Sequence, residues 1–287
     1  MAVASVFKGS HLPVVVSTRE FTVAQRVLMM GDSVLFTGLS KPECMEIASS
    51  ARSRTFACDE LMYSEGDPAQ NMVQIYTGSA KISRLSPNGN EVILWMAGPG
   101  DPVGVLADSL THSYTCSARA MEQSTALVWE YTRLQTVLVK YPRIGRNFGQ
   151  ILSTRLSDLQ ERFCEVSTEQ VAKRLAFALL RLLKQVGKPA HGGIEISLTR
   201  EELAQMTGTT LFTISRVLSR WGEEGSVLPR REAIVVLDVD LLAKKCRVGG
   251  LGIGKQKQPR ESVPHVSRLK PGKSRAKIVH EPSHTIQ

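Results

Sequence analysis

Short stretches of apolar and polar residues occupy positions 33–130, and glycine-containing turns separate them. The turns read Glu-Gly-Asp-Pro at 65–68, Tyr-Thr-Gly-Ser at 76–79, Pro-Asn-Gly-Asn at 87–90 and Gly-Pro-Gly-Asp at 98–101. Asn88-Gly89, between two apolar stretches, predicts a tight β-hairpin. Turns at intervals of about 10–12 residues are typical of an antiparallel sandwich or barrel. A short helix over 41–53 is expected before it.

A long helix is predicted over 142–165. Apolar residues recur along it at steps of four, four, three and four, and they are Phe148, Leu152, Leu156, Leu159 and Phe163. Arg155, Asp158 and Glu161 flank this narrow stripe. A narrow apolar seam suits a helix that pairs with its own copy. An ordinary helix packed on its own domain has the same spacing, and spacing alone slightly favours this second interpretation.

A mostly apolar helix is expected over 171–186, and the segment TREELAQMTGTTLFTISRVLSRWGEEG follows it at 199–225. Thr199 and Glu202 have the spacing of a capping box, which begins a short helix. Gly208 fits a tight turn, and Thr210 is placed to cap a second helix that ends near residue 224. Two short helices joined through a glycine turn predict a helix-turn-helix.

The second of these helices has two distinct faces. Its core face repeats at i, i+3, i+4 and i+7, in Ile214, Val217, Leu218 and Trp221. The opposite face carries Phe212, Ser215, Arg216 and Ser219, with Arg220 at its edge. In a helix-turn-helix the N-terminal part of this helix enters the major groove of DNA, so we expect the second face to contact bases.

Each residue type on that face has a matching DNA contact. Arg216 can donate two hydrogen bonds to guanine, which is worth roughly 1–3 kcal/mol of discrimination, and Phe212 can pack on a thymine methyl. Ser215 can contact a base edge or a phosphate. The alternatives are a solvated charge for Arg216 and an intradomain or dimer contact for Phe212. Phosphate contacts are expected from Thr199, Thr210 and Thr213.

The segment at 229–237 reads Pro-Arg-Arg-Glu-Ala-Ile-Val-Val-Leu and predicts a strand hairpin directly after the helix pair, as in a winged helix. Arg230 and Arg231 could contact backbone phosphates there. The helix pair alone is a moderate signal, because helical hairpins are common. The wing strengthens the prediction of a DNA-binding domain.

Charge adds a second basic region. The net charge is +9. The segment after position 243 contains eleven basic residues and only two acidic ones, Glu261 and Glu281, so it carries the whole excess and the preceding chain is formally neutral. This tail has few large apolar residues and is expected to be disordered. It either adds sequence-independent attraction to DNA or serves only as a solubilising extension.

Other classes of protein lose support. The five cysteines contain no CxxC, which argues against a zinc ribbon or a disulfide framework and fits a reducing cytosol. No apolar run is long enough for a membrane span, and no secretory signal is evident. No nucleophile–base pair, HExxH or P-loop indicates an enzyme. Residues 1–30 have no clear periodicity, and the first 28 or 29 residues are either a misassigned start or a short flexible arm.

The order of elements, with EGDPAQNMVQIYTGSAKI at 65–82 and TISRVLSRWGEEG at 213–225, resembles the CRP/FNR family of bacterial transcription regulators. The resemblance implies an α+β fold: an antiparallel β-roll like that of cyclic-nucleotide-binding domains, a long dimerisation helix and a C-terminal winged helix-turn-helix. The expected parts are a flexible N-terminal arm (1–33), the β-roll effector domain (34–134), linker and dimerisation helix (135–165), the winged helix-turn-helix (166–243) and the disordered basic tail (244–287).

Departures from the family pattern argue against two known effectors. Family members that bind cyclic AMP carry Gly-Glu-Leu, Arg-Ser and Thr-Ser where this chain has Gly104-Val105-Leu106, Tyr114-Thr115 and Leu159-Gln160. These seven positions are the candidate effector pocket. A buried phosphate without its arginine would be unpaired, so cyclic AMP is not the expected effector. Residues 1–43 contain no cysteine, which argues against an iron–sulfur cluster.

Phe212 replaces the glutamate that is usual in the FNR-like branch, whose Ser-Arg pair is retained at Ser215 and Arg216. We therefore expect a TTG-type core read by Arg216, with an altered preference beside it. Nitric-oxide-responsive members also depart at this position, so a haem-linked sensor using His112 is an alternative, although a lone loop histidine is more often simply solvated. Cys116 is expected to be a small buried residue rather than a redox sensor.

The resemblance therefore implies a cytoplasmic homodimer on an inverted repeat, with recognition helices roughly 34 Å apart. Double-stranded DNA is the expected partner, and RNA polymerase is a candidate second one. The effector is unidentified. A ligand-binding module with a degenerate DNA head, acting through protein partners, is the remaining alternative.

Overall fold

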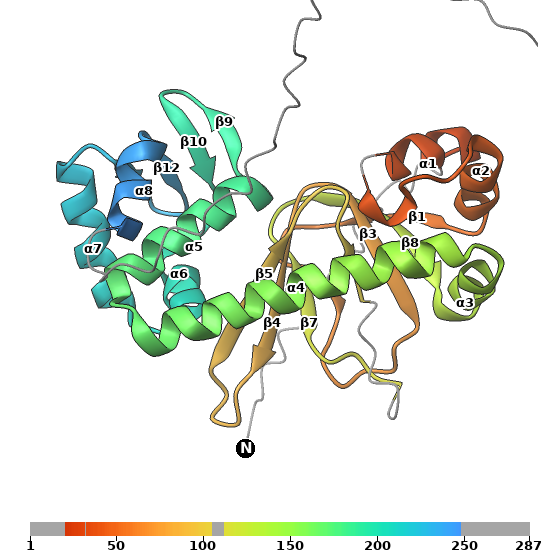
Figure 1. The fold of residues 1–287 in the computed structure, drawn as a ribbon, viewed down its shortest axis with the longest axis horizontal. Coiled ribbons are helices and arrows are strands. Elements are labelled where there is room, and N and C mark those ends of the chain that lie inside the picture. The colour runs from red at the N-terminus through yellow and green to blue at the C-terminus, as the bar shows by residue number, and fades with distance from the viewer. Residues whose placement is uncertain (1–20, 32, 105–111, 248–287) are drawn as a thin grey trace, which may run out of the picture. The chain divides into compact units, whose positions relative to one another are not determined.

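The computed structural model describes residues 21–31, 33–104 and 112–247. Most of the expected N-terminal arm and nearly all of the basic tail lie outside these residues, as do Val105 and Leu106. Figure 1 shows the order of the helices and strands along the chain.

Two four-stranded antiparallel sheets form the predicted roll, with strand orders β1-β8-β3-β6 and β2-β7-β4-β5. The strands are β1 (Arg52–Phe56), β2 (Leu61–Tyr63), β3 (Asn71–Thr77), β4 (Ala80–Leu85), β5 (Glu91–Ala97), β6 (Pro102–Val103), β7 (Ser117–Ala120) and β8 (Ser124–Glu130). Phe56, Ile75 and Val128 from the first sheet pack with Ile82 and Ala118 from the second. The β4–β5 hairpin turns at Asn88-Gly89, as the sequence predicts.

A second core covers the other face of the first sheet. Trp129 of β8 packs there with Met30 and Ile47, and its indole N–H donates to the Ile47 carbonyl at 3.1 Å. The helices that contribute are α1 (Val23–Met30), the 3₁₀ helix η1 (Val34–Phe36), α2 (Lys41–Ser49), α3 (Tyr131–Lys140) and the first turns of α4 (Pro142–Thr168).

Three expectations about helices need correction. The region expected as a flexible arm contains α1, whose Thr22 capping box fixes its start and whose Met29 and Met30 are buried. The helix expected over 41–53 ends at Ser49, because the next residues join β1. The sequence reading also missed α3, which spans the expected boundary between roll and linker.

The winged helix-turn-helix follows α4 as predicted. Its elements are α5 (Val171–Val186), β9 (Lys188–Ala190), β10 (Gly193–Ile196), α6 (Arg200–Thr207), α7 (Leu211–Glu223), β11 (Val227–Pro229), β12 (Ile234–Val236) and α8 (Val239–Arg247). The sheet order β11-β12-β10-β9 contains the predicted wing hairpin. The structure also corrects the start of the tail, because α8 continues to Arg247 and Lys245 forms an ion pair with Glu224.

The core of this head extends onto the roll. Leu179, Leu218 and Trp221 are buried in the head, and Ile93 and Met96 of β5 belong to the same apolar cluster. The roll strand β5 is thus part of the surface on which the head is built.

Candidate nucleic-acid interface and effector site

The turn between α6 and α7 is set by local signals. The Thr199 hydroxyl accepts from the Glu202 N–H at 3.2 Å, while the Glu202 carboxylate accepts from the Thr199 N–H at 2.9 Å, which completes the capping box. Gly208 ends α6 with a φ of +62°, a left-handed conformation that glycine adopts readily. The Thr210 hydroxyl then caps α7 by accepting from the Thr213 N–H at 3.3 Å.

Helix α7 divides its side chains as the sequence predicts. Ile214, Leu218 and Trp221 are buried, whereas Phe212 is 75% exposed and Arg216 is exposed on the other side. Within the described part of the chain, Arg216 makes no hydrogen bond and no ion pair. A guanidinium with five free donors and an aromatic ring therefore project from the first half of α7.

The residues on the predicted DNA-binding surface differ in whether their polar groups already have hydrogen-bond or ion-pair partners. The Thr199 hydroxyl is occupied by the capping box and is half-buried, so its visible role is to begin α6. Thr210 and Thr213 lie at the start of α7, with their hydroxyl oxygens 3.0 Å apart. Ser215 is half-buried. Arg220 lies 3.6 Å from Glu224 in a turn-to-turn ion pair.

The wing contributes one engaged arginine and one exposed arginine. Arg230 forms an ion pair of 2.6 Å with Glu195 on β10, whereas Arg231 at the tip is exposed. Arg231 is thus the freer of the two for a phosphate contact.

A buried lysine that the sequence reading missed ties the roll to the head. Lys81 of β4 is 8% exposed and lies 3.1 Å from Glu91 on β5 and 3.6 Å from Glu202 on α6. Burial raises the pKa of Glu91, but hydrogen bonds from Ser83 and Lys81 outweigh it, and the net shift is downward. The only available signal was a lysine at an inward position of a strand, because its two partners are distant in sequence.

Two tyrosine side chains pack against Gly104, where the resemblance predicts the nucleotide site. Tyr63 and Tyr114 stack there with ring centroids 4.1 Å apart. The Tyr114 hydroxyl donates to the Asn71 carbonyl and accepts from the Asn71 N–H, both at 2.9 Å. Gly104 has a φ of +78°, and a Cβ there would lie 2.8 Å from the Asn71 carbonyl oxygen.

The space left beside Gly104 is about 20 Å³, which is room for about one water molecule. Arg155 of α4 also lines it, but this guanidinium stacks on Trp95 and faces Asp101 at 3.6 Å. Burial raises the pKa of the Tyr63 hydroxyl well above its usual value, so it is a neutral group here. The described residues therefore do not fit a cyclic nucleotide.

Five of the seven candidate effector residues are described by the structure, and it does not bring these five together. Gly104 and Tyr114 adjoin each other and Thr115 is half-buried close by, whereas Leu159 and Gln160 lie exposed on α4. Leu159 lines a different cavity. Val105 and Leu106 lie outside the described residues.

Two further candidates near this loop have different environments. His112 is exposed, and it lines neither the space beside Gly104 nor the cavity that Leu159 lines. Cys116 is buried, as expected, and burial raises the pKa of its thiol, which disfavours the reactive thiolate.

The predicted seam on α4 splits into two parts. Phe148 packs against the chain's own core and Leu152 lines the cavity beside Gly104. Farther along, the apolar side chains are exposed: Leu156 by 58%, Leu159 by 40% and Phe163 by 74%. The first half is thus an ordinary packed helix, and the second half presents an apolar stripe without a partner in the described chain.

Across the described residues, none of the helices is long and apolar enough to cross a membrane. A β-roll joined through a long helix to a winged helix-turn-helix defines the class of two-domain transcription regulators.

Comparisons with known proteins identify the family. The profile of the cyclic nucleotide-binding domain matches residues 53–141, and that of the Crp-like helix-turn-helix domain matches residues 173–245. The chain is 24% identical over 215 residues to the CRP-like cAMP-activated global transcriptional regulator of Mycobacterium tuberculosis, covering 74% of this chain and 96% of the relative. It is 28% identical over 198 residues to the cyclic AMP receptor protein of Thermus thermophilus, covering 69% and 89%.

Solved structures show the same fold. The c-di-GMP-responsive global regulator CLP of Xanthomonas campestris superposes with a TM-score of 0.61 at 23% identity, over 69% of this chain and 100% of the other. FixK2 of Bradyrhizobium japonicum gives 0.60 at 21% identity, over 68% and 96%. The chain belongs to the CRP/FNR family of transcription regulators, and its relatives are regulators rather than enzymes.

Proposed function

We propose that this regulator works as a homodimer in the cytoplasm and binds an inverted repeat with a TTG-type core. The observation that carries the proposal is the exposed face of α7, where Arg216 has five donors and no partner among the described residues. A guanidinium at this position can form the bidentate contact with guanine that specifies a base pair. Phe212 beside it supplies an apolar contact in place of a carboxylate.

The exposed half of the α4 seam supports the dimer. Fully burying a leucine or phenylalanine side chain is worth about 1.5–3 kcal/mol, and each copy offers Leu156, Leu159 and Phe163. Pairing these stripes between two copies would remove them from water. A symmetric dimer would then present two α7 helices about one DNA turn apart, roughly 34 Å, which sets the half-site spacing.

The effector of this dimer is not cyclic AMP. The small space beside Gly104 and the Tyr63–Tyr114 stack support this part of the proposal. A signal that shifts the packing of α4 would reorient the heads, as a population shift between two states. RNA polymerase is the protein partner expected for an activator.

The test is an equilibrium DNA-binding measurement with the full chain. Fluorescently labelled duplexes carrying a TTG-type inverted repeat are compared with a scrambled duplex of equal length at the same salt, because phosphate contacts alone give salt-dependent affinity. We expect the repeat to bind at least about 1,000-fold more tightly than the scrambled duplex. Equal affinities would overturn the proposal and favour a module that acts through protein partners. Sedimentation of the free protein measures the dimer independently.

A further inference from the structure

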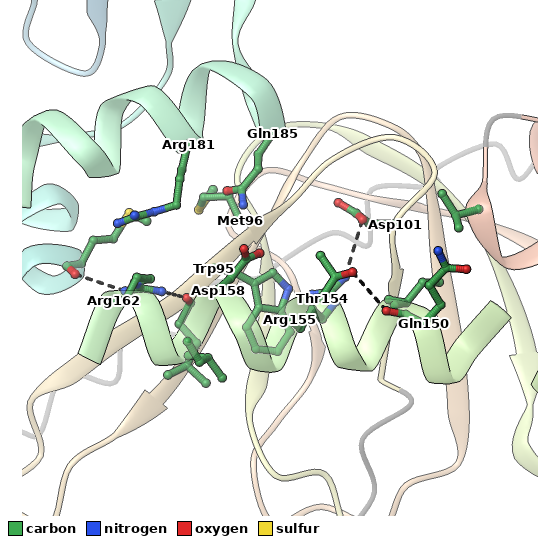
Figure 2. Close-up of a pocket in the computed structure, with 15 residues that line it drawn as sticks. Trp95, Met96, Asp101, Gln150, Thr154, Arg155, Asp158, Arg162, Arg181 and Gln185 are labelled. Atoms are coloured by element: carbon green, nitrogen blue, oxygen red, sulfur yellow. Dashed lines mark hydrogen bonds and ion pairs between the residues drawn. The ribbon is translucent and has the colours of Figure 1, made fainter. Parts of the chain in front are cut away.

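A cavity of about 370 Å³ lies where β5, α4, α5 and the end of α6 meet (Figure 2). Its volume falls within the range of small-molecule sites, roughly 300–1,000 Å³. It is distinct from the small space beside Gly104, although Trp95 and Arg155 line both. None of the residues that line it belongs to α7.

One wall of this cavity is apolar. Its side chains come from the roll, from α4 and from the end of α6, and they are Leu94, Trp95, Met96, Ile151 and Met206. Such a wall can hold the carbon body of a ligand but gives it no orientation. Orientation has to come from the polar groups opposite.

Those polar groups form a charged stripe along α4. Arg155, Asp158 and Arg162 follow one another at i, i+3 and i+7, so they share one face of the helix and all line the cavity. Figure 2 shows Asp158 between the two arginines. The cavity therefore presents a cation, an anion and a cation in sequence.

Arg162 is fixed by carbonyl oxygens alone. Its guanidinium donates to the carbonyls of Leu94, Ile93 (3.0 Å) and Met206 (3.2 Å), and no carboxylate of the described chain lies within ion-pair distance. Burial, and then the neighbouring Arg181, lower the pKa of Arg162. Carbonyl oxygens therefore hold this guanidinium at one end of the cavity, while Glu165 and Asp158 act on its charge from beyond ion-pair distance.

Arg181, a further arginine of the cavity wall, already has a carboxylate partner. Glu165 neutralises it through two hydrogen bonds of 2.5 and 2.8 Å.

Arg155 uses few of its donors. Its ring partner is Trp95, 4.6 Å from the guanidinium carbon to the ring centroid, and Asp101 lies 3.6 Å away. Its hydrogen bond within the described chain goes to the Pro102 carbonyl, at 3.3 Å. A guanidinium has five N–H donors, and a carboxylate binds it in a bidentate fork.

Asp158 is the complementary group. It is half-buried and makes no hydrogen bond or ion pair with the described residues. An ionised carboxylate is an acceptor only, so it would accept from an ammonium group. Asp158 acts electrostatically on both arginines and offsets part of their charge, so a ligand that carries a carboxylate and an ammonium would match all three groups.

We propose that this cavity is the effector site of the regulator and that it binds a small zwitterion of the α-amino-acid class with a large apolar side chain. Residues three apart on a helix are neighbours, about 5–6 Å between Cβ atoms. Arg155 and Asp158 are thus placed to receive a carboxylate and an ammonium that share one carbon atom. The side chain of the ligand would lie along the apolar wall.

The position of the cavity supplies the coupling, and this step rests on the proposed DNA-binding function. Its walls include Trp95 and Met96 of the roll, Arg181 and Gln185 of α5, and Met206 at the end of α6. A ligand that contacts roll, dimer helix and head at once has different contacts when the head moves. It can therefore bias the population of head positions.

The binding test uses calorimetry on the full chain without DNA and three matched probes. L-phenylalanine carries both charges, 3-phenylpropionate lacks the ammonium, and phenethylamine lacks the carboxylate. We expect saturable binding of L-phenylalanine, and at least about tenfold weaker binding of each single-charge probe, because each leaves a charged protein group unpaired.

Variants then assign the binding to the cavity. Asp158→Asn should remove the preference for the zwitterion, so that 3-phenylpropionate binds at least as well as L-phenylalanine. Thr154→Trp should fill the cavity and abolish binding of all three probes. Glu161→Gln, on the exposed side of the same helix, should bind like the unchanged chain. Thermal unfolding of each variant checks that it folds.

Three results would overturn the proposal. One is the absence of saturable binding for all three probes up to about 10 mM, where even a millimolar ligand saturates. Another is unchanged selectivity in Asp158→Asn. The third is binding that leaves affinity for the TTG-type repeat unaltered, because the effector role would then fail. Since the calorimetry contains no DNA, failure of the proposed DNA recognition leaves its result readable.

Discussion

The exposed face of α7 and the inner face of the roll beside Gly104 differ in whether their polar groups have hydrogen-bond partners. On α7, Arg216 projects without a partner among the described residues, and its donors are left for another molecule. Beside Gly104, Tyr114 is stacked on Tyr63 and its hydroxyl is bonded twice to Asn71. Polar groups are thus left open on the exposed face of α7, whereas the described side chains beside Gly104 are bonded to one another.

The largest expected effect comes from the exposed half of the α4 seam. Phe163→Asp should convert the dimer to a monomer and weaken binding to the inverted repeat by about 100-fold or more, because the second half-site no longer adds avidity. Val139→Asp is the matched control, since Val139 is 83% exposed on α3, outside the seam. Sedimentation and DNA binding measure both variants. A dimeric Phe163→Asp protein would contradict the proposal that the exposed half of the α4 seam forms the dimer interface.

Arg216→Ala tests the open surface directly. Loss of a bidentate guanine contact should cost about 1–3 kcal/mol, or roughly 5–150-fold in affinity for the repeat, with little change for scrambled DNA. Arg146→Ala removes the same charge from an exposed position of α4 and should affect both duplexes equally. Equal losses in the two variants would mean that Arg216 contributes charge but no base recognition.

Phe212→Glu sharpens the comparison by restoring a carboxylate that can accept from cytosine N4. We expect the preferred base beside the TTG core to change, by about tenfold in relative affinity, while unfolding stays unchanged because the side chain is exposed. Selection of bound sequences from a randomised duplex pool reads this out. An unaltered base preference would place Phe212 outside the DNA interface.

On the closed side, Gly104→Ala should destabilise the roll by about 1–3 kcal/mol, since alanine is strained at positive φ and its Cβ would crowd the Asn71 carbonyl. Gly149→Ala on α4 is the control. Its Cβ would meet open space, and alanine there should stabilise the helix by about 0.5–1 kcal/mol. Denaturant unfolding measures both, and equal effects would contradict the close packing beside Gly104.

The smallest expected effect is that of cyclic AMP itself. Titration into the full chain should release no saturable heat, because the space beside Gly104 is about 20 Å³. Saturable micromolar binding would show that the Tyr63–Tyr114 stack opens.

The head was predictable because its signals are local. Thr199 with Glu202, Gly208 and Thr210 mark helix ends within a few residues of one another, and the period of Ile214, Leu218 and Trp221 marks the buried face. Asn88-Gly89 marked the β4–β5 hairpin in the same way. These features depend on backbone chemistry that a short window of sequence already contains.

The polar sites of the roll were not predictable because they join distant segments. The sequence places Arg155 and Asp158 only as flanks of an apolar stripe, whereas in the structure both line a cavity with residues of β5 and α5. Among the described pocket positions, Tyr114 stacks on Tyr63, whereas Leu159 and Gln160 lie exposed on α4, and no local signal shows this separation. Helix α1 was missed because its buried Met29 and Met30 acquire a core only from β8 and α2.

The contacts of Lys81 affect how the roll and the head unfold and whether they can be separated. It meets Glu202, a residue that also caps the first turn of the helix-turn-helix, and β5 beside it lends Ile93 and Met96 to the core of the head. We therefore expect the roll and the head to unfold as one cooperative unit, with a single heat-absorption peak where the sequence suggests two modules. A chimera that joins this head to another roll would keep the DNA-sequence preference of the head. The head would lose part of its core unless the foreign strand matched β5.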